Sequence, residues 1–287
     1  MADVCVVTIV RGRHEHLGHQ LRLLAQSDPD SVHVLVSMDD PDIRTIARRH
    51  GGAREIEVVN CAPDPRGLPL ASARNVGVAR AIVRHCEVVV LLDVDCLVGD
   101  QTLARYVQAA RAHPHALLCG PVTYLAPDAR PPRAAEELQA LTDPHPARPA
   151  PVPGRAETGD QYHLFWSLSA ALTPPTWHEL GGFCEEYVGY GAEDTDLGFV
   201  ARRQQVELVW VGGADAYHQH HPVSSPPVEH LEAIVRNANT FFWRWGQWPM
   251  QGWLHAFSDL GLVDVDGRGA LVVSTPAAAP TPEAGPA

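Results

Sequence analysis

The sequence contains no lysine, and all 22 basic side chains among its 287 residues are arginine. The absence of lysine excludes Schiff-base chemistry and a phosphate-binding loop built around a lysine ammonium group. Positive charge is also outnumbered, since the 22 arginines face 34 carboxylates and the formal net charge is −12. We therefore expect no nucleic acid and no anionic membrane as the main partner, since both bind clustered positive charge. The acidity leaves room for an anionic ligand bridged by a metal ion.

Long apolar runs and cysteine pairs are also absent. No run of about 18 apolar residues exists, and Met1 leads almost directly into a strand-like segment without a basic region or cleavage site. We expect no transmembrane segment and a cytoplasmic location. The cysteines are scattered without a CxxC pair, which predicts reduced, mostly buried thiols. They are Cys5, Cys61, Cys86, Cys96, Cys119 and Cys184.

What the first 125 residues do contain is an alternation of strand-like and helix-like segments. Strands are expected at 4–10, 32–36, 55–59, 87–92 and 116–122, and helices at 16–25, 42–50, 69–85 and 99–113. The nearly continuous Val/Leu run at 87–92 is typical of a strand buried on both faces. This order predicts an α/β fold with an open, mostly parallel sheet and helices on both faces. Its ligand site is expected at the carboxyl ends of the strands.

The remaining chain is expected to have three parts. Residues 126–160 are rich in Pro, Ala and Arg, with one short helical candidate at 134–141, and predict a lid or an acceptor loop. Residues 161–273 regain regular patterning and predict the second half of the same domain, with structure at 162–172, 193–204, 206–211 and 227–245. Residues 274–287 are Pro/Ala-rich and predict a disordered tail.

Two carboxylates, Asp93 and Asp95, follow the strand at 87–92 directly. Strand alternation is expected to place both on one face. Such a pair at the carboxyl end of a buried strand suits a hard divalent cation, with the second carboxylate on water or a ribose hydroxyl. The alternative is a solvated turn, because Asp is common after strands.

The segment 181–197 reads GGFCEEYVGYGAEDTDL and combines glycines with a Glu-Asp pair that opens a helix. The glycines allow the backbone to approach a ligand closely. Glu193, Asp194 and Asp196 are favoured there by the helix dipole alone. The functional alternative is a general base for a hydroxyl group.

Two further features carry candidate chemistry. His218, His220 and His221 lie within four residues after a predicted strand, so one of them could serve as a metal ligand. Arg74 lies in the first turns of a helix, and Arg11 follows the first strand. A guanidinium at either place can chelate phosphate oxygens or form an ordinary salt bridge.

Together these motifs resemble the family 2 nucleotide-sugar glycosyltransferases of the GT-A fold, over about residues 4–245. The resemblance is carried by the opening VTIVR, Met38-Asp39-Asp40, Ala73-Arg74-Asn75 and the DXD-type Asp93-Val94-Asp95. The segment 181–197 looks like the GGF…GxGxED block of the galactosyltransferase-type C-terminal region. The resemblance implies a metal-dependent, inverting transfer of a sugar from a nucleotide sugar, in the first place a UDP-sugar. The acceptor would be a hydroxyl of a carbohydrate, lipid-linked or small-molecule compound.

On the donor side, the resemblance implies four contacts. Asp39 would contact the nucleobase, and Arg11 and Arg74 would lie near the nucleotide and its diphosphate. Asp93 would reach the ribose or a metal-bound water. Residues 1–125 would thus form the nucleotide-sugar-binding half, and 161–273 the acceptor-binding and catalytic half.

For the chemistry, the resemblance implies a divalent cation and a base. Asp95 would bind Mn²⁺ or Mg²⁺ directly, and His218 would be the other protein ligand, with His220 as its rival. Asp194 would be the catalytic base, and Glu193 would orient the acceptor or the donor sugar. The sequence departs from the family at Ala192, where a glycine is usual, and at 10–13, which lacks the usual Asn-bearing turn.

Two alternative functions and the role of one segment stay open at this point. A sugar-1-phosphate nucleotidyltransferase would also use paired aspartates and a divalent ion, and a non-catalytic nucleotide-sugar-binding module would keep the fold without turnover. The Trp-rich segment 241–253 is expected to pack over the catalytic domain. A sugar-stacking platform or a peripheral contact with a lipid-linked acceptor at a membrane surface is its alternative role.

Overall fold

A computed structural model describes residues 3–274 of the chain. Apart from Ser274, the predicted disordered tail 274–287 lies outside the described residues. Within the described residues, no helix is long and apolar enough to cross a membrane. All six cysteines are free thiols, of which Cys184 is partly exposed and the others are buried.

The main body is a sheet of eight strands in the order β3-β2-β1-β4-β9-β6-β10-β8. The strands are β1 (Val4–Val10), β2 (Val32–Met38), β3 (Ile56–Cys61), β4 (Val88–Leu92), β6 (Ala116–Cys119), β8 (Ala156–Gly159), β9 (Ser169–Leu172) and β10 (Glu207–Val211). β9 and the edge strand β8 run antiparallel to their neighbours, and the others are parallel to one another. The predicted α/β class with a mostly parallel sheet is confirmed.

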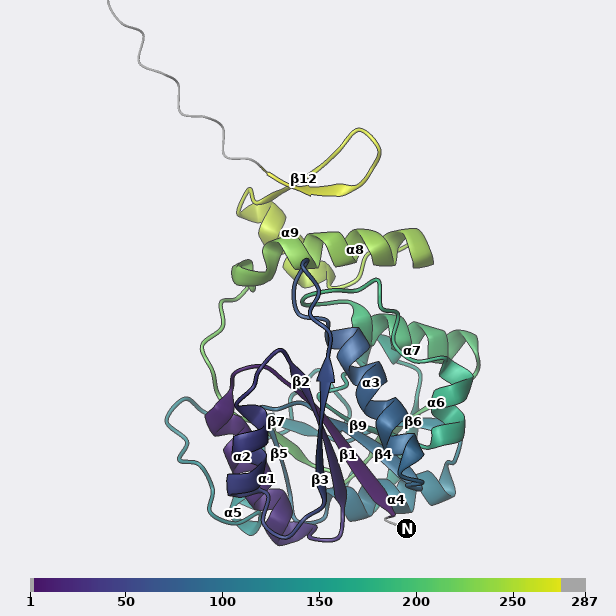
Figure 1. Ribbon diagram of the computed structural model, residues 1–287. Coiled ribbons are helices and arrows are strands. Elements are labelled where there is room, and N and C mark those ends of the chain that lie inside the picture. The colour runs from purple at the N-terminus through teal and green to yellow at the C-terminus, as the bar shows by residue number, and fades with distance from the viewer. Residues whose placement is uncertain (1–2, 275–287) are drawn as a thin grey trace, which may run out of the picture.

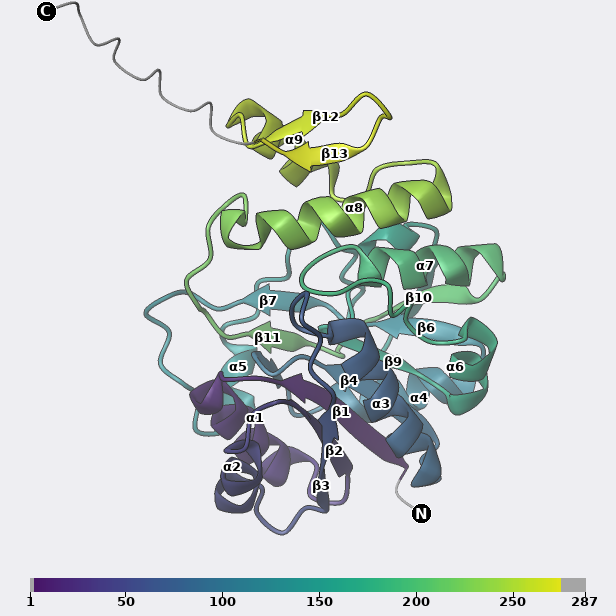
Figure 2. The ribbon, with the colours of Figure 1, turned by 45° about the horizontal axis from the view of Figure 1, so that its top comes forward.

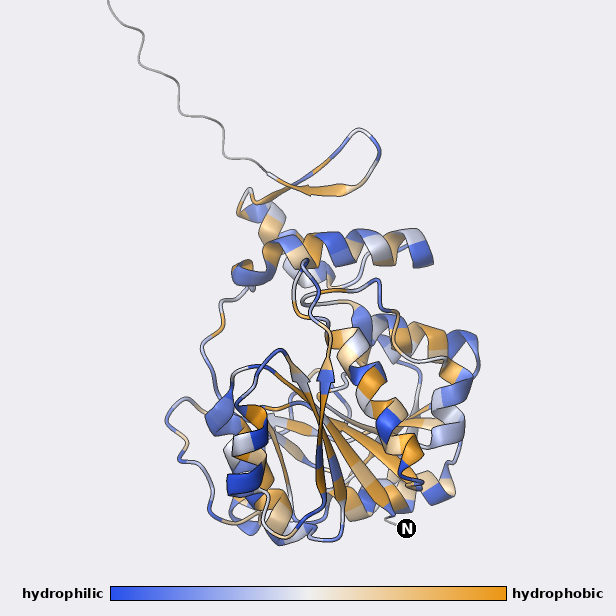
Figure 3. Cartoon of the chain, in the orientation of Figure 1, coloured by the Kyte–Doolittle hydropathy of each residue, from blue (hydrophilic) through white to orange (hydrophobic). Residues whose placement is uncertain are grey.

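Helices cover both faces of this sheet (Figure 1). They are α1 (His14–Ser27), α2 (Ile43–His50), α3 (Leu70–Val83), α4 (Thr102–Ala112), α6 (Pro174–Leu180) and α7 (Glu193–Arg203). Odd-numbered β1 residues such as Val7 pack towards α3, α6 and α7, whereas Val4 and Val6 pack towards α4. Figure 3 shows the resulting apolar sheet between helices of mixed hydropathy.

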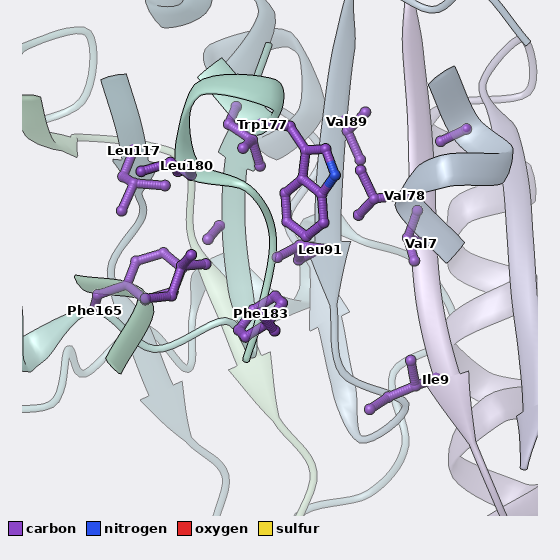
Figure 4. Close-up of a cluster of buried hydrophobic side chains, with 14 of the residues drawn as sticks. Val7, Ile9, Val78, Val89, Leu91, Leu117, Phe165, Trp177, Leu180 and Phe183 are labelled. Carbon is purple, nitrogen blue, oxygen red and sulfur yellow. The ribbon is translucent and has the colours of Figure 1, made fainter. Parts of the chain in front are cut away.

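The first of these two cores is built around Trp177 and Phe183, whose ring centroids lie 5.9 Å apart. In Figure 4 the Trp177 indole lies over Leu91 of β4 and beside Val78 of α3. Gly77 of α3 permits this close packing on the sheet, because a Cβ there would lie 2.3 Å from Cγ1 of Val7. This contact keeps the amino end of α3 beside the carboxyl ends of β1 and β4.

The predicted strand 116–122 is wrong as a single element. It divides at Gly120 into β6 of the main sheet and β7 (Val122–Tyr124) of a second sheet. The second sheet has the order β5-β11-β7, with β5 (Cys96–Val98) and β11 (Ala216–His218). A Cβ at Gly120 would lie 1.8 Å from the Ala214 carbonyl oxygen, so the chain bends where the two backbones nearly touch.

The C-terminal region forms a layer above the carboxyl ends of the main-sheet strands (Figures 1 and 2). It comprises α8 (Leu231–Trp245), α9 (Gln251–Asp259) and the hairpin of β12 (Val263–Val265) and β13 (Leu271–Val273). The expected helix 227–245 thus becomes a 3-10 turn, Val228–His230, followed by α8. The sequence pattern did not predict α6, α9 or the hairpin.

The Pro-rich segment 126–160 packs against the body of the protein. It contains the single-turn helix α5 (Glu136–Gln139), whose Leu138 is buried, and ends in β8. Thr142 is hydrogen-bonded to Tyr217 of β11, with 2.7 Å between the two hydroxyl oxygens. Likewise, the expected regular segment 162–172 is a 3-10 turn, Tyr162–Leu164, followed by β9.

Candidate active site

A cavity of about 1500 Å³ is lined by residues at the carboxyl ends of the strands and by residues of the C-terminal layer. Both halves of the chain line it. Ile9, Arg11 and Met38 come from the first half, and Glu193, Asp194 and Trp253 from the second. The volume exceeds the 300 to 1,000 Å³ or so that is usual for a single ligand, which leaves room for two substrates.

Asp93 and Asp95 line this cavity from the turn that follows β4. The expectation that both lie on one face of a strand is wrong, because β4 ends at Leu92 and the amide of Cys96 donates to the Asp93 carbonyl oxygen at 2.9 Å. In this turn the carboxylates of Asp93 and Asp95 contact different partners. Asp93 faces Arg74, whereas Asp95 faces two histidines.

Asp95, His218 and His221 form a compact group, with their potential ligand atoms within 4.8 Å of one another. Oδ1 of Asp95 lies 3.6 Å from Nε2 of His218, and Oδ2 lies 3.4 Å from Nε2 of His221. Burial opposes ionisation of Asp95, but a hydrogen bond from His221 and the nearby positive charges together hold its pKa below the usual value. Burial lowers the pKa of His218, which favours the neutral imidazole that binds metals.

The second sheet brings these residues together. β11 pairs with β5 so that His218 lies opposite Cys96, next to Asp95. The amide of Gln219 then donates to the Asp95 carbonyl oxygen at 2.7 Å, and the chain turns so that His221 reaches the carboxylate. The side chain of His220 is exposed and lies outside this group. The sequence offered all three histidines as candidates, and the family resemblance favoured His218 and then His220 over His221.

Arg74 lies between the two halves of the cavity. Its Nη2 donates to Oδ1 of Asp93 at 3.1 Å and its Nη1 to Oε1 of Glu193 at 3.2 Å. The side chain is 6% exposed. Although burial alone would lower the pKa of Arg74, the charges of Asp93, Asp194 and Glu193 together raise it above its usual value. Arg74 therefore holds two carboxylates in place, and its expected position near a diphosphate stays a prediction.

Glu193 and Asp194 open α7, and both side chains line the cavity. Burial and the neighbouring Asp194 raise the pKa of Glu193 to about 7, although Arg74 opposes the rise. Burial likewise raises the pKa of Asp93 to about 6 against the charge of Arg74. These shifted carboxyl groups in one cleft mark it as a candidate catalytic site.

Asp194 is held by a residue that the sequence did not single out. Ser167 donates twice to its carboxylate, from the backbone amide to Oδ2 at 2.9 Å and from the hydroxyl to Oδ1 at 2.6 Å. Ser167 itself is fully buried in the turn before β9. No local pattern marks this serine, because only the packing of α7 against that turn brings it to Asp194.

At the carboxyl ends of β1 and β2, the structure places only some of the expected donor-binding residues at the cavity. Arg11 is exposed and lines the cavity, as does Met38. Among the described residues, Asp39 is exposed and does not line it. Its neighbour Asp40 accepts hydrogen bonds from the Gly12 amide at 2.7 Å and from Nε2 of His14 at 2.8 Å. A base contact by Asp39 therefore stays a prediction.

Comparison with known proteins finds similarity in structure alone. No protein-family model matches the chain, and no curated protein matches it in sequence. Among solved structures, GalNAc-T7 with UDP, GalNAc and Mn²⁺ superposes with a TM-score of 0.57 at 14% identity. The alignment covers 85% of this chain and 50% of that one, so the chain spans half the length of this neighbour. TarS 1-349 of S. aureus in complex with UDP-GlcNAc has a TM-score of 0.56 at 13% identity, with coverages of 90% and 80%.

These similarities show that the chain has the GT-A fold of glycosyltransferases. At this level of identity they establish the fold and leave the activity to be argued from the site.

Proposed function

We propose that this protein is a metal-dependent, inverting glycosyltransferase that moves a sugar from a nucleotide sugar to an acceptor hydroxyl. The observation that carries the proposal is that Arg74 connects two walls of the cavity. We call the turn after β4 the donor wall and the start of α7 the acceptor wall. On one wall, Asp93 stands two residues before Asp95 in the turn after β4. Arg74 connects Asp93 to Glu193, which directly precedes Asp194 at the start of α7 on the other wall.

The two walls carry complementary chemistry. The donor wall holds Asp95 with His218 and His221, and the acceptor wall holds Asp194 with Ser167. Between them, the buried Arg74 compensates carboxylates that would otherwise repel one another. An anionic nucleotide could approach so acidic a site only with cationic help, which Arg11, Arg13 and a divalent cation would supply.

The residues present fit a divalent cation. One carboxylate and two imidazoles converge within 4.8 Å, and this mixed oxygen and nitrogen donor set suits Mn²⁺ better than Mg²⁺, which prefers oxygen ligands. Asp95, His218 and His221 would hold the ion, and Asp93 would contact a bound water or the ribose. When bound, the ion would supply Lewis acidity towards the leaving diphosphate.

The chain's own residues account for the rest of the reaction. Asp194 would take the proton from the acceptor hydroxyl as its oxygen forms a bond to the anomeric carbon. The bond from that carbon to the diphosphate oxygen breaks, and the electron pair leaves with the nucleoside diphosphate. Attack from the face opposite the leaving group inverts the anomeric centre. Glu193, held by Arg74, would orient the acceptor or the donor sugar.

A UDP-sugar is the donor we propose first. Both neighbours described above were solved with a uridine nucleotide, one of them together with Mn²⁺. The acceptor would be a carbohydrate, lipid-linked or small-molecule hydroxyl, since the cavity has room beyond the donor.

A donor panel tests the proposal. UDP-, GDP- and dTDP-sugars are added with and without Mn²⁺, and thermal shift reports binding because a ligand of the native state raises its stability. Release of nucleoside diphosphate is then measured with the donor that binds. We expect Mn²⁺-dependent release from a UDP-sugar, slow without an acceptor and faster with a suitable one.

Two results would contradict this function. Release of pyrophosphate from a nucleoside triphosphate and a sugar phosphate would identify a nucleotidyltransferase, and donor binding without release under any condition would indicate a binding module. The variant Asp194→Asn separates binding from transfer. It is expected to bind the donor normally and to lose transfer, and full turnover in this variant would show that Asp194 is not the base.

A further inference from the structure

Helix α8 is hydrogen-bonded to and packed against the loop 188–191, which leads to Asp194, the proposed base. Nη2 of Arg236 donates to the Val188 carbonyl oxygen at 2.6 Å, and Nδ2 of Asn237 donates to the Gly191 carbonyl oxygen at 3.0 Å. Gly189 lies so close to α8 that a Cβ there would be 2.7 Å from Cβ of Ala233. The backbone of 188–191 therefore follows the position of α8.

The same helix reaches the first turn of α7 through Asp196. Oδ1 of Asp196 accepts hydrogen bonds from Nε1 of Trp245 at 2.6 Å and from the Tyr187 hydroxyl at 3.1 Å. It also lies 2.8 Å from Nε of Arg244. Asp196 is 1% exposed, and its three partners come from the end of α8 and from the loop before α7.

Aromatic packing surrounds this polar contact. Phe199 of α7 meets Phe241 and Trp245 of α8 edge to face, at centroid distances of 5.2 and 5.5 Å. Edge-to-face contacts of this kind stabilise the packing of two helices beyond the burial of the rings. The packing gives the Trp-rich segment a defined partner, namely the helix that carries Glu193 and Asp194.

The arrangement has a physical consequence for the base. A buried carboxylate is costly unless its hydrogen bonds are satisfied, so Asp196 favours the one placement of α8 that supplies Trp245 and Arg244. Asp196 lies in the same helical turn as Asp194. Displacement of α8 would thus move the turn that carries the base. A shift of about 1 Å at a reacting group is enough to cost on the order of a hundredfold in rate.

We propose that Asp196 is a positioning residue that couples α8 to the first turn of α7, so that the C-terminal helices set the placement of Asp194 and complete the acceptor side of the cavity. Trp253 on α9 stacks on Tyr190 with 5.8 Å between ring centroids, and both side chains line the cavity. The part of this inference that concerns the acceptor rests on the function proposed above, whereas the coupling of the two helices does not.

Three variants of the full chain test the coupling. Trp245→Phe keeps an aromatic ring and removes the N–H that Asp196 accepts, and Asp196→Ala removes the carboxylate. Asp196→Asn keeps an oxygen acceptor and is the conservative rescue. Trp243→Phe is the matched control, because Trp243 lies on the same helix with 65% of its surface exposed.

Amide hydrogen exchange decides the coupling without any assay of activity. We expect Trp245→Phe and Asp196→Ala to raise exchange at 187–196 by roughly tenfold or more while exchange in β4 is unchanged, since local opening is governed by local contacts. Asp196→Asn should lie between wild type and Asp196→Ala, and Trp243→Phe should match wild type. Unchanged exchange at 187–196 in both Trp245→Phe and Asp196→Ala would overturn the coupling.

Kinetics then test its role in transfer. In Trp245→Phe we expect transfer to fall by roughly tenfold and the KM for the acceptor to rise, with the KM for the donor within about twofold of wild type. A uniform loss of donor and acceptor binding would overturn the positioning role and indicate a general structural defect. Failure of wild type to release any nucleoside diphosphate would instead refute the proposed function, and the exchange result would still stand or fall by itself.

Discussion

Arg74 and Glu193 form a buried ion pair, with 3.2 Å between Nη1 and Oε1, that joins α3 to the amino end of α7. The two residues are far apart in sequence, and each belongs to a different half of the cavity. Their side chains are 6% and 9% exposed, so water screens the pair weakly. The pair therefore links the folding of the two halves to the geometry of the site.

Loss of Arg74 should be strongly destabilising. Arg74→Met leaves Asp93 and Glu193 buried without their shared cation, and breaking such a pair costs about 3 kcal/mol or more. Because the pKa of Glu193 is already raised to about 7, removal of the opposing charge should raise it further. The folded state then binds the proton more tightly than the unfolded chain, so the free energy of unfolding should fall more steeply than in wild type as pH rises from about 5 to about 8.

Urea denaturation across this pH range measures the effect. Arg80→Met is the matched control, since Arg80 lies on the same helix but pairs with Glu57 at the surface, where an ion pair contributes at most about 1 kcal/mol. If the two variants lost the same free energy of unfolding, the buried ion pairs of Arg74 would contribute no more than the surface pair of Arg80.

The metal site predicts a pattern over neighbouring histidines. His218→Ala and His221→Ala should each weaken Mn²⁺ binding by roughly 100-fold, because loss of a direct ligand costs at least as much as loss of a supporting contact. His220→Ala should leave it unchanged, since that side chain is exposed and outside the group. Titration of free Mn²⁺ by electron paramagnetic resonance gives the affinities. If His220→Ala lost more Mn²⁺ affinity than His221→Ala, His220 and not His221 would be the second histidine ligand.

Apolar periodicity was sufficient to predict the first four main-sheet strands and the helices between them. Val88–Leu92 is buried along its whole length, as a continuous Val/Leu run in a parallel sheet covered on both faces should be. The short strands β5 and β11 could not be predicted in this way. Each has three residues, and it forms because a distant strand supplies the hydrogen bonds.

The site residues show the same contrast between local sequence patterns and distant contacts. Residues marked by local motifs, such as Asp93, Asp95 and Asp194, could be named from the sequence, and the structure places all three at the cavity. Ser167 could not be named, and His221 could not be chosen over its neighbours, because tertiary contacts alone bring these two residues to their partners. For His221 the direction of the loop depends on Gln219, whose amide binds the Asp95 carbonyl oxygen.

The backbone conformation of Ala192, just before α7, predicts that glycine at this position stabilises the protein. Ala192 has φ +76° and ψ −20°, a left-handed conformation that costs a residue with a Cβ about 1 kcal/mol and glycine very little. Ala192→Gly should therefore raise the free energy of unfolding by up to about 1 kcal/mol. Ala201→Gly, inside the same helix, should lower it by about 1 kcal/mol. Chemical denaturation of both variants tests the contrast, and a destabilised Ala192→Gly would show that packing of the Ala192 methyl group outweighs the strain.

His33 predicts a loss of stability in mild acid that is independent of the active site. The imidazole is fully buried on β2, with Nε2 2.9 Å from Oγ1 of Thr8 and Nδ1 3.3 Å from Nη1 of Arg54. Burial, assisted by the charge of Arg54, lowers its pKa well below the usual value. Below about pH 6.5 the unfolded chain therefore binds a proton that the folded state does not, and the free energy of unfolding should fall by up to about 1.4 kcal/mol per pH unit from this group.

His33→Gln should flatten this slope between about pH 6.5 and about pH 5, even if it lowers stability at neutral pH, because glutamine has no proton to bind in that range. His178→Gln is the control, since His178 is exposed on α6. Urea midpoints at several pH values give both slopes. An undiminished slope in His33→Gln would mean that other groups, and not this buried imidazole, destabilise the protein in acid, because the loss of the titrating site must remove its share of the proton uptake.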